Sequence, residues 1–414
     1  MRILLVNATA YPQIGGVENS LHYIAQALLS EGHEAKIFCF QFTPGEPLSM
    51  DHSGVEIIRY PCKNERWPHK QYMSRVKAAE LGISKSMGGF RPNAVWSRNV
   101  SVGAGIRRSG YKGPLLQIFP TNAKMNCKGA FLQTTGLPLS RRLILLGLWP
   151  FAYFTSRYFE QELSGQCTPV TFSENMRKQL LKGFPQKKRA CYLIRPGVDE
   201  KVFSPENGYR FFETIERRYG LSRKEPIVLY VGRLSCAKHL PMFMNAISML
   251  RTTAKLVLVG SGPEEKRLKE YVRDLGIAGQ IIFAGSHYKM LPGFYSMSRV
   301  CVLPTTIESF GQVYIESLAA GTPVVGFGGG SSVLTATDEI IADGKTGVIV
   351  KDISAEALSH AIDSILALDD EKYKVMSGYC RDDTISRFSW KQFVIQGLNL
   401  SKKDPAYLKT GYGL

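Results

Sequence analysis

The 414-residue sequence has no apolar run near the roughly 18 residues that a membrane-spanning helix needs. Its N-terminal apolar run, residues 3–6, stops at Asn7 and is too short for a secretory signal peptide. The eight cysteines include no CxxC pair, and several lie within apolar segments, which favours reduced core residues over disulfides or metal ligands. These absences predict a cytoplasmic protein that is not exported.

Two ligand-binding signatures are also missing. The loop after the first apolar segment reads NATAYPQIGG and lacks the GxGxxG pattern of dinucleotide-dependent oxidoreductases. There is no Asp-x-Asp pair and no His or Cys spacing typical of a metal site. The sequence therefore predicts neither a redox cofactor nor a bound metal.

Acidic residues are absent from residues 81–159, which carry eleven lysines and arginines. Residues 1–200 hold 26 Lys and Arg against 13 Asp and Glu, so they carry +13 of the total net charge of +17. Such an excess favours an anionic partner. Nucleic acid is disfavoured because the sequence lacks a recognised nucleic-acid-binding motif.

Short apolar segments alternate with segments of helical period throughout the chain, which predicts doubly wound parallel α/β sheets. The length favours two domains. We place the first at 1–200, joined back by a final helix from about 388, and the second at 201–387, after a Pro- and Gly-containing linker at 195–208. The predicted strands are residues 2–7, 35–40, 55–59, 94–97, 115–119, 170–172, 192–194, 227–231, 256–259, 281–283, 300–303, 324–327 and 348–350.

Residues 300–330 combine a strand, a glycine turn and a helix expected at 312–320. A helix that begins at the carboxyl end of a parallel strand directs its N–H groups at a crevice, where they can bind phosphate. Glu308 and Glu316 flank this position, and carboxylates accept hydrogen bonds from sugar hydroxyls. These features together suit a nucleotide sugar. Compensation of the helix dipole would explain Glu316 equally well, but it does not explain Glu308.

Two cations follow the strand at 227–231, namely Arg233 and Lys238, and either could be merely solvated. At a strand's carboxyl end they could neutralise a diphosphate. Glycine turns at Gly260–Gly262 and Gly15–Gly16 lie on the edges where α/β sheets bind ligands.

Residues 136–163 form the most unusual stretch of the first half, because Arg141 and Arg142 precede a dense apolar and aromatic segment. One interpretation is a buried helix, in which Pro150 would interrupt any single long amphipathic helix. The other is an interfacial segment whose arginines meet anionic lipid headgroups. The second interpretation predicts peripheral contact with the inner face of a membrane.

Six segments together resemble glycosyltransferase family 4, whose members are retaining enzymes of the GT-B fold. They are GGVENSLHYIAQALLSEGHE, FSENMRKQLL, IRPGVDEKVFSP, VGRLSCAKHL, GSGPEEKRL and ESFGQVYIESLAAGTPVV. The resemblance spans nearly the whole chain and implies two Rossmann-like domains facing across a cleft. It implies that the N-terminal domain binds the acceptor and the C-terminal domain binds the nucleotide sugar.

The resemblance also implies roles for individual residues. Arg233 and Lys238 correspond to the pair that binds the donor diphosphate, Glu308 to the residue at the transferred sugar, and Glu316 to the one at the ribose. The other implied donor contacts are Gly15, Gly16, Gly232, Gly262, Ser309, Phe310, Gly311 and Gln312. Many members carry a histidine after the strand that reads LLQIFPTNAK here, where this sequence has Gln117, Thr121 and Asn122. We take Thr121 and Asn122 as acceptor-side candidates.

The resemblance implies a retaining, metal-independent hexosyltransferase that uses a nucleotide diphosphate sugar as co-substrate and no cofactor, with a UDP-sugar favoured over a GDP-sugar. The acceptor hydroxyl would attack from the face of the leaving phosphate, which itself takes the proton. A glycan or lipid-linked acceptor of bacterial surface-polysaccharide biosynthesis is expected. A small soluble acceptor and a nucleotide-sugar 2-epimerase of the same fold are the alternatives.

Overall fold

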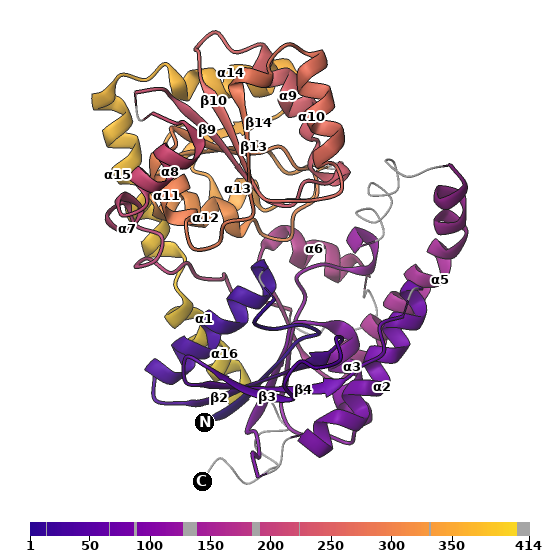
Figure 1. The fold of residues 1–414 in the computed structure, drawn as a ribbon. Coiled ribbons are helices and arrows are strands. Elements are labelled where there is room, and N and C mark those ends of the chain that lie inside the picture. The colour runs from indigo at the N-terminus through magenta and orange to yellow at the C-terminus, as the bar shows by residue number, and fades with distance from the viewer. Residues whose placement is uncertain are drawn as a thin grey trace. The chain divides into compact units, whose positions relative to one another are not determined.

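The computed structural model describes residues 1–13, 15–65, 67–86, 89–126, 139–183, 191–222, 224–330 and 333–403. The chain divides into two compact units (Figure 1). Unit 1 contains Met1–Lys128, Ser140–Gly197 and Trp390–Leu414, and unit 2 contains Val198–Ser389. The last helix is therefore part of unit 1, although it follows unit 2 in the sequence.

Unit 1 is built on an eight-stranded sheet in the order β3-β4-β2-β1-β5-β6-β7-β8. All neighbouring strands pair in parallel except β3 and β4. The strands are β1 (Arg2–Val6), β2 (Glu34–Gln41), β3 (Ser49–His52), β4 (Val55–Pro61), β5 (Ala94–Ser97), β6 (Leu115–Ile118), β7 (Thr168–Thr171) and β8 (Tyr192–Leu193). The order reverses at β1, because β2 and β5 lie on its two sides, so the predicted doubly wound sheet is confirmed.

The sequence reasoning missed β3, which pairs antiparallel with β4. Three of its four residues, SMDH, are polar, and all four alternate between exposed and half-buried, so no apolar run marks it. The connection consists of Ser53 and Gly54, both with positive φ (55° and 79°). Such a two-residue turn fits the right-handed twist of a β-hairpin.

The helices described in unit 1 are α1 (Gly16–Ser30), α2 (Pro68–Ser86), α3 (Val100–Arg108), α5 (Leu139–Ser164), α6 (Glu174–Gly183) and α16 (Trp390–Lys403). Helix α16 is anchored to the core of unit 1. Trp96 donates its indole N–H to the hydroxyl of Ser401 at 2.9 Å. A side chain at Gly397 would meet the ring of Trp96 at 2.7 Å, so only glycine allows this close packing.

Helix α5 differs from the buried-helix interpretation in two respects: Pro150 does not interrupt it, and only part of it is buried. It runs unbroken through Pro150, although an interior proline removes one backbone hydrogen bond. Its C-terminal half supplies the compensating contacts, because Phe159 and Leu163 are buried in the core of unit 1. Earlier positions point outward, however, and Phe151 and Phe154 are 62% and 66% exposed.

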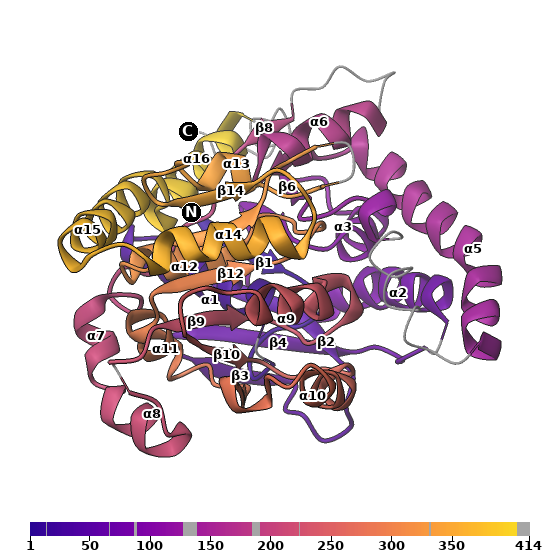
Figure 2. The same ribbon diagram turned by 90° about the horizontal axis from the view of Figure 1, so that it is seen from above.

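Unit 2 contains a six-stranded, fully parallel sheet in the order β11-β10-β9-β12-β13-β14 (Figure 2). The strands are β9 (Ile227–Val231), β10 (Lys255–Val259), β11 (Ile281–Gly285), β12 (Val300–Leu303), β13 (Val324–Phe327) and β14 (Gly347–Val350). All six were predicted within two residues of these bounds. Their side chains are mostly apolar and buried, as expected for a parallel sheet covered on both faces.

The helices described in unit 2 are α7 (Pro205–Tyr209), α8 (Phe212–Tyr219), α9 (Leu240–Ser248), α10 (Glu265–Asp274), α11 (Leu291–Met297), α12 (Gln312–Ala319), α13 (Thr337–Ile340), α14 (Ala355–Leu366) and α15 (Asp370–Arg387), with short 3₁₀ turns η1 (Cys236–Lys238) and η2 (Ala278–Gln280). Helix α7 begins inside the expected linker. Its start is fixed by Ser204, whose hydroxyl accepts a hydrogen bond from the N–H of Asn207.

Seven cysteines fall in the described part of the chain, and all seven are free thiols. Six of them are buried and Cys236 is half-buried. Burial raises the pKa of the Cys191 thiol to about 11, so this thiol stays protonated at neutral pH. The six buried cysteines are core residues, as predicted; Cys127 lies outside the described residues.

Candidate functional site

The strand order of unit 2 reverses between β9 and β12. These two strands pair only at Val228 with Val300 and at Leu229 with Cys301, although both continue two residues further. The unpaired ends lie at the carboxyl edge of the sheet. Ligands of open α/β sheets bind outside such a reversal point, so the loops after β9 and β12 form the candidate site.

The loop after β9 packs directly on the loop after β10. The N–H groups of Gly232 and Leu234 donate to the carbonyl oxygens of Val259 and Ser261, each at 3.0 Å. A Cβ at Gly260 would lie 1.9 Å from the carbonyl oxygen of Gly232, and one at Gly262 would lie 2.1 Å from that of Leu234. The glycines therefore allow backbone contact that fixes the loop carrying Arg233.

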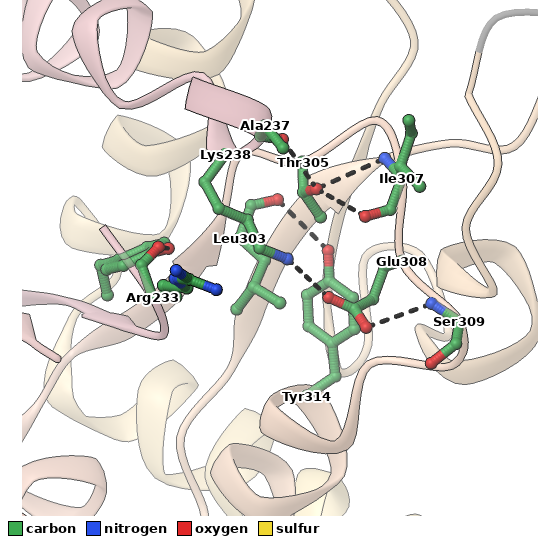
Figure 3. Close-up of polar contacts among 10 residues, drawn as sticks. Arg233, Ala237, Lys238, Leu303, Thr305, Ile307, Glu308, Ser309 and Tyr314 are labelled. Atoms are coloured by element: carbon green, nitrogen blue, oxygen red, sulfur yellow. Dashed lines mark hydrogen bonds and ion pairs between the residues drawn. The ribbon is translucent and has the colours of Figure 1, made fainter. Parts of the chain in front are cut away.

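Lys238 and Glu308 meet across the reversal point. Lys238 ends η1, after β9, and Glu308 follows β12. The ammonium of Lys238 lies 2.7 Å from Oε2 of Glu308, and Oε1 of Glu308 accepts from the N–H of Ser309 at 3.1 Å (Figure 3). The two side chains are 21% and 23% exposed, so this ion pair is partly accessible to a ligand.

Two threonines after β12 hold the loops together. The hydroxyl of Thr305 donates to the carbonyl oxygen of Ile307 at 3.0 Å. Nε2 of His239 is hydrogen-bonded to the hydroxyl of Thr306 at 2.9 Å. His239 follows Lys238 directly, and Thr306 precedes Glu308 by two residues. These contacts position the ion pair, and the sequence reasoning did not identify them because nothing local distinguishes these residues.

Arg233 is exposed, and its guanidinium points toward the Lys238–Glu308 pair (Figure 3). Its carbonyl oxygen accepts a hydrogen bond from the buried hydroxyl of Tyr230 at 2.9 Å. The backbone is thus fixed while the charged head stays accessible. Arg233 and Lys238 place two cations at the predicted position, and Glu308 is adjacent to them.

Helix α12 begins directly after Gly311, which has a left-handed backbone (φ 101°). The first N–H groups of a helix have no acceptor within that helix; at the start of α12, the N–H of Tyr314 donates to the carbonyl oxygen of Gly311 at 2.9 Å. The side chain of Phe310 is buried and packs against the ring of Phe388, so the expected donor contact of Phe310 would be made by its backbone.

Glu316 lies in the middle of α12 and is 8% exposed. Its Oε2 accepts a hydrogen bond from the hydroxyl of Tyr295 on α11 at 2.9 Å. Burial raises the pKa of Glu316 to about 7, and the bond from Tyr295 opposes this rise. The carboxylate of Glu316 is therefore hydrogen-bonded to α11, whereas that of Glu308 contacts Lys238 and Ser309.

The predicted residues of unit 1 lie at the carboxyl edge of its own sheet. Gly15 precedes α1 in an extended conformation, and a Cβ there would lie 2.5 Å from Oε2 of Glu18. Space is open at Gly16. Thr121 is half-buried, and Oδ1 of Asn122 accepts the N–H of Met125 at 2.9 Å, so this side chain already caps a turn.

Among the described residues, no cluster of three His, Cys, Asp or Glu side chains is arranged to hold a metal ion. Nor does any helix in the described ranges combine the length and the apolar content that crossing a membrane requires.

A family model described as "Glycosyl transferases group 1" matches residues 211–383, which lie within unit 2. A GDP-mannose-dependent alpha-(1-6)-phosphatidylinositol monomannoside mannosyltransferase from Mycolicibacterium smegmatis is 25% identical over 94% of this chain and 95% of its own. A GDP-mannose-dependent alpha-mannosyltransferase from Mycobacterium tuberculosis is 27% identical over 78% of each chain. These matches support a glycosyltransferase of family 4. The resemblance in sequence is thereby confirmed.

The fold of the chain agrees with a solved structure. Sucrose-phosphate synthase from Thermosynechococcus elongatus matches it with a TM-score of 0.77 and 21% identity, over 97% of this chain and 98% of that one. Two Rossmann-like parallel-sheet domains of the GT-B type, as predicted, are therefore confirmed. The family match also favours transfer over the 2-epimerase alternative.

Proposed function

We propose that this chain transfers mannose from GDP-mannose, with retention of anomeric configuration, to a lipid-linked acceptor at a membrane surface. The observation that carries the proposal is the ion pair of Lys238 and Glu308 at the reversal point of the second sheet, with the exposed Arg233 pointing toward it and α12 beginning just after Glu308. Cations and helix N–H groups suit a diphosphate, and the adjacent carboxylate suits sugar hydroxyls.

The choice of GDP-mannose rests on the two mannosyltransferase relatives, whose names state dependence on this donor. It replaces the preference for a UDP-sugar that the sequence resemblance suggested. The buried carboxyl of Glu316 is assigned to the hydroxyls of the ribose, which both nucleotides share. The guanine base would therefore be selected by other residues of unit 2.

We assign the departing diphosphate to Arg233, Lys238 and the N–H groups at the start of α12. As the bond from the anomeric carbon to the phosphate oxygen breaks, negative charge grows on the β-phosphate, and these fixed donors stabilise it. The acceptor hydroxyl attacks from the same face and gives its proton to the leaving phosphate oxygen. In this scheme no metal supplies the compensating charge.

The membrane part of the proposal rests on α5. Its exposed apolar side chains, Leu143, Phe151, Phe154 and Tyr158, recur every three to eight residues and share one side of the helix. The segment 81–159 around them contains eleven basic and no acidic residues. An apolar stripe within a basic segment fits a bilayer containing anionic lipids. The M. smegmatis relative is named for a phosphatidylinositol-based acceptor, which agrees with this choice.

A donor screen tests the catalytic part. Purified protein is incubated with GDP-mannose, GDP-glucose, UDP-glucose or UDP-galactose, with and without a membrane extract, and nucleotide release and labelled lipid are measured. We expect acceptor-dependent release of GDP from GDP-mannose. Faster turnover of any UDP-sugar would overturn the donor assignment, and release of free sugar epimers would overturn transfer.

Co-sedimentation with vesicles tests the membrane part. Binding to vesicles with 30% anionic lipid, a composition chosen for the assay, should be salt-sensitive. It should fall about tenfold in the Phe151→Ser, Phe154→Ser double variant, because two exposed aromatic rings no longer enter the interface. Val375→Ser, on the exposed face of α15 in unit 2, is the matched control. Equal binding of all three proteins would leave a soluble acceptor as the better choice.

A further inference from the structure

Arg98 lies outside the proposed donor site, and its buried guanidinium has two unpaired nitrogen atoms. It follows β5 directly in unit 1 and is only 6% exposed. Its Nε and Nη1 atoms are fully buried and have no hydrogen-bond partner among the described residues. Buried polar groups in folded proteins are nearly always paired, so an orphaned guanidinium requires an explanation.

The neighbours of Arg98 supply ring contact and one carboxylate that acts at a distance, but no hydrogen-bond partner for Nε or Nη1. The guanidinium carbon lies 4.8 Å from the ring centre of Phe172, which follows β7. The carboxylate of Glu18, on α1, acts on Arg98 electrostatically but accepts the hydroxyl of Thr9. Burial lowers the pKa of Arg98 to about 10, so the group stays charged at neutral pH. A buried charge of this kind is strongly unfavourable unless an anion pairs with it.

Arg98 also lies at the reversal point of its own sheet. The strand order of unit 1 reverses at β1, whose two neighbours are β2 and β5. The N–H of Arg98 donates to the carbonyl oxygen of Val6, the last residue of β1, at 3.0 Å. The backbone of Arg98 therefore lies where the carboxyl ends of β1 and β5 meet, and its guanidinium reaches toward Phe172, which follows β7. This is the edge at which open α/β sheets bind ligands.

We propose that Arg98 binds an oxyanion, the phosphate group of the acceptor substrate. A guanidinium presents several fixed N–H donors that match a phosphate, and the two unpaired atoms are free to donate to it. The donor diphosphate is already assigned to Arg233, Lys238 and α12 in unit 2, so the anion at Arg98 has a different source. Naming the acceptor as that source rests on the proposed function, whereas anion binding at Arg98 does not.

Inorganic phosphate is the probe for the site itself. The melting temperature of the full-length protein is measured in sodium phosphate and in sodium chloride of equal ionic strength. At about ten times its dissociation constant, phosphate should raise the melting temperature by about 3 °C beyond chloride. Arg98→Met should lose this phosphate-specific rise and should melt no lower than wild type in chloride, because a buried charge with two unpaired nitrogen atoms is removed. Arg91→Gln changes an exposed arginine of the same unit and is the control.

Arg98→Lys keeps the charge but loses the planar array of N–H donors. This variant keeps the test valid if Arg98→Met does not fold. We expect it to retain a reduced rise, with phosphate affinity about tenfold weaker. An equal phosphate-specific rise in wild type and Arg98→Met would overturn the site, as would no such rise in wild type.

A second arm identifies the source of the anion. If phosphate marks the acceptor subsite, saturating GDP should leave the phosphate-specific rise intact. Loss of the rise with GDP would assign the anion to the donor and overturn the acceptor assignment. In steady-state assays, phosphate should compete with the acceptor, and Arg98→Lys should raise the KM for the acceptor at least tenfold without changing that for the donor. If GDP-mannose is not turned over but the Arg98-dependent rise persists, the proposed function fails and the anion site stands.

Discussion

Glu316 offers a sharp test, because the effect of burying its carboxyl can be measured through the pH dependence of protein stability. The pKa of its carboxyl is raised by burial from an ordinary 4.5 to about 7. Between these two pH values, the Glu316 carboxyl is therefore still protonated in the folded state but already ionised in the unfolded state. For this group, the contribution to stability is fully present below pH 4.5 and is lost as the pH rises to about 7.

A rise of the pKa from 4.5 to about 7 corresponds to about 3 kcal/mol of unfolding free energy. Glu316→Gln has the same shape but no titration, and its amide oxygen can still accept the hydroxyl of Tyr295. At pH 4.5 the variant and wild type should be about equally stable. At pH 8 the variant should be more stable by up to about 3 kcal/mol.

Urea unfolding followed by circular dichroism at pH 4.5, 6, 7 and 8 measures this difference. Glu356→Gln, an exposed carboxyl at the start of α14, is the control and should show no growing difference. A stability difference for Glu316→Gln that stays constant across this range would refute the argument from burial.

The same carboxyl should report ligand binding. Ribose hydroxyls that donate to Glu316 favour its charged form and lower its pKa. Binding of GDP near pH 7 should therefore release a fraction of a proton, which calorimetry in buffers of different ionisation enthalpy measures. Glu316→Gln should abolish the release. Release that is equal in wild type and variant would assign the proton to another group and remove Glu316 from the ribose.

Three further outcomes are expected. Arg233→Gln should lower kcat/KM about 100- to 1,000-fold in a GDP-release assay, because a fixed cation is lost where negative charge develops on the leaving phosphate. Arg251→Gln changes another exposed arginine of unit 2 and should leave kcat/KM unchanged. Gly260→Ala should lower the melting temperature by several degrees, since its Cβ would lie 1.9 Å from a carbonyl oxygen and its φ is 148°. Glu308→Gln should bind GDP alone about threefold more tightly by calorimetry, because Lys238 is released from its partner; weaker binding would contradict this.

The fold was largely predictable because buried parallel strands are short, apolar and β-branched. The segments IVLYV, VCVL and VVGF of unit 2 were placed without error at 227–231, 300–303 and 324–327. Strand β3 was not, because a polar edge strand carries no such signal. Pro150 misled the interpretation of α5, since the packing of the following turns outweighs the missing hydrogen bond.

The candidate site was predictable where the chemistry is local. Arg233, Lys238 and Glu308 were identified from their positions after strands, and the structure pairs Lys238 with Glu308 and points Arg233 toward them. The contacts that hold them were not predictable, because His239 and Thr306 meet over 67 positions in the sequence. The state of Glu316 also depends on a distant partner, Tyr295 on another helix. Sequence indicates which groups are present, and packing decides which of them are already paired.

The pairing of Lys238 with Glu308 bears directly on how a nucleotide sugar would be recognised. In the structure each group satisfies the other, and both are more than three-quarters buried. A diphosphate that binds Lys238 takes the ammonium from Glu308 and leaves a partly buried carboxylate without its partner, which is unfavourable unless hydroxyl groups replace it. A sugar attached to that diphosphate supplies such hydroxyls, whereas a free nucleotide does not. If the donor binds as proposed, the ion pair couples phosphate binding to sugar binding and favours the intact donor over the spent nucleotide.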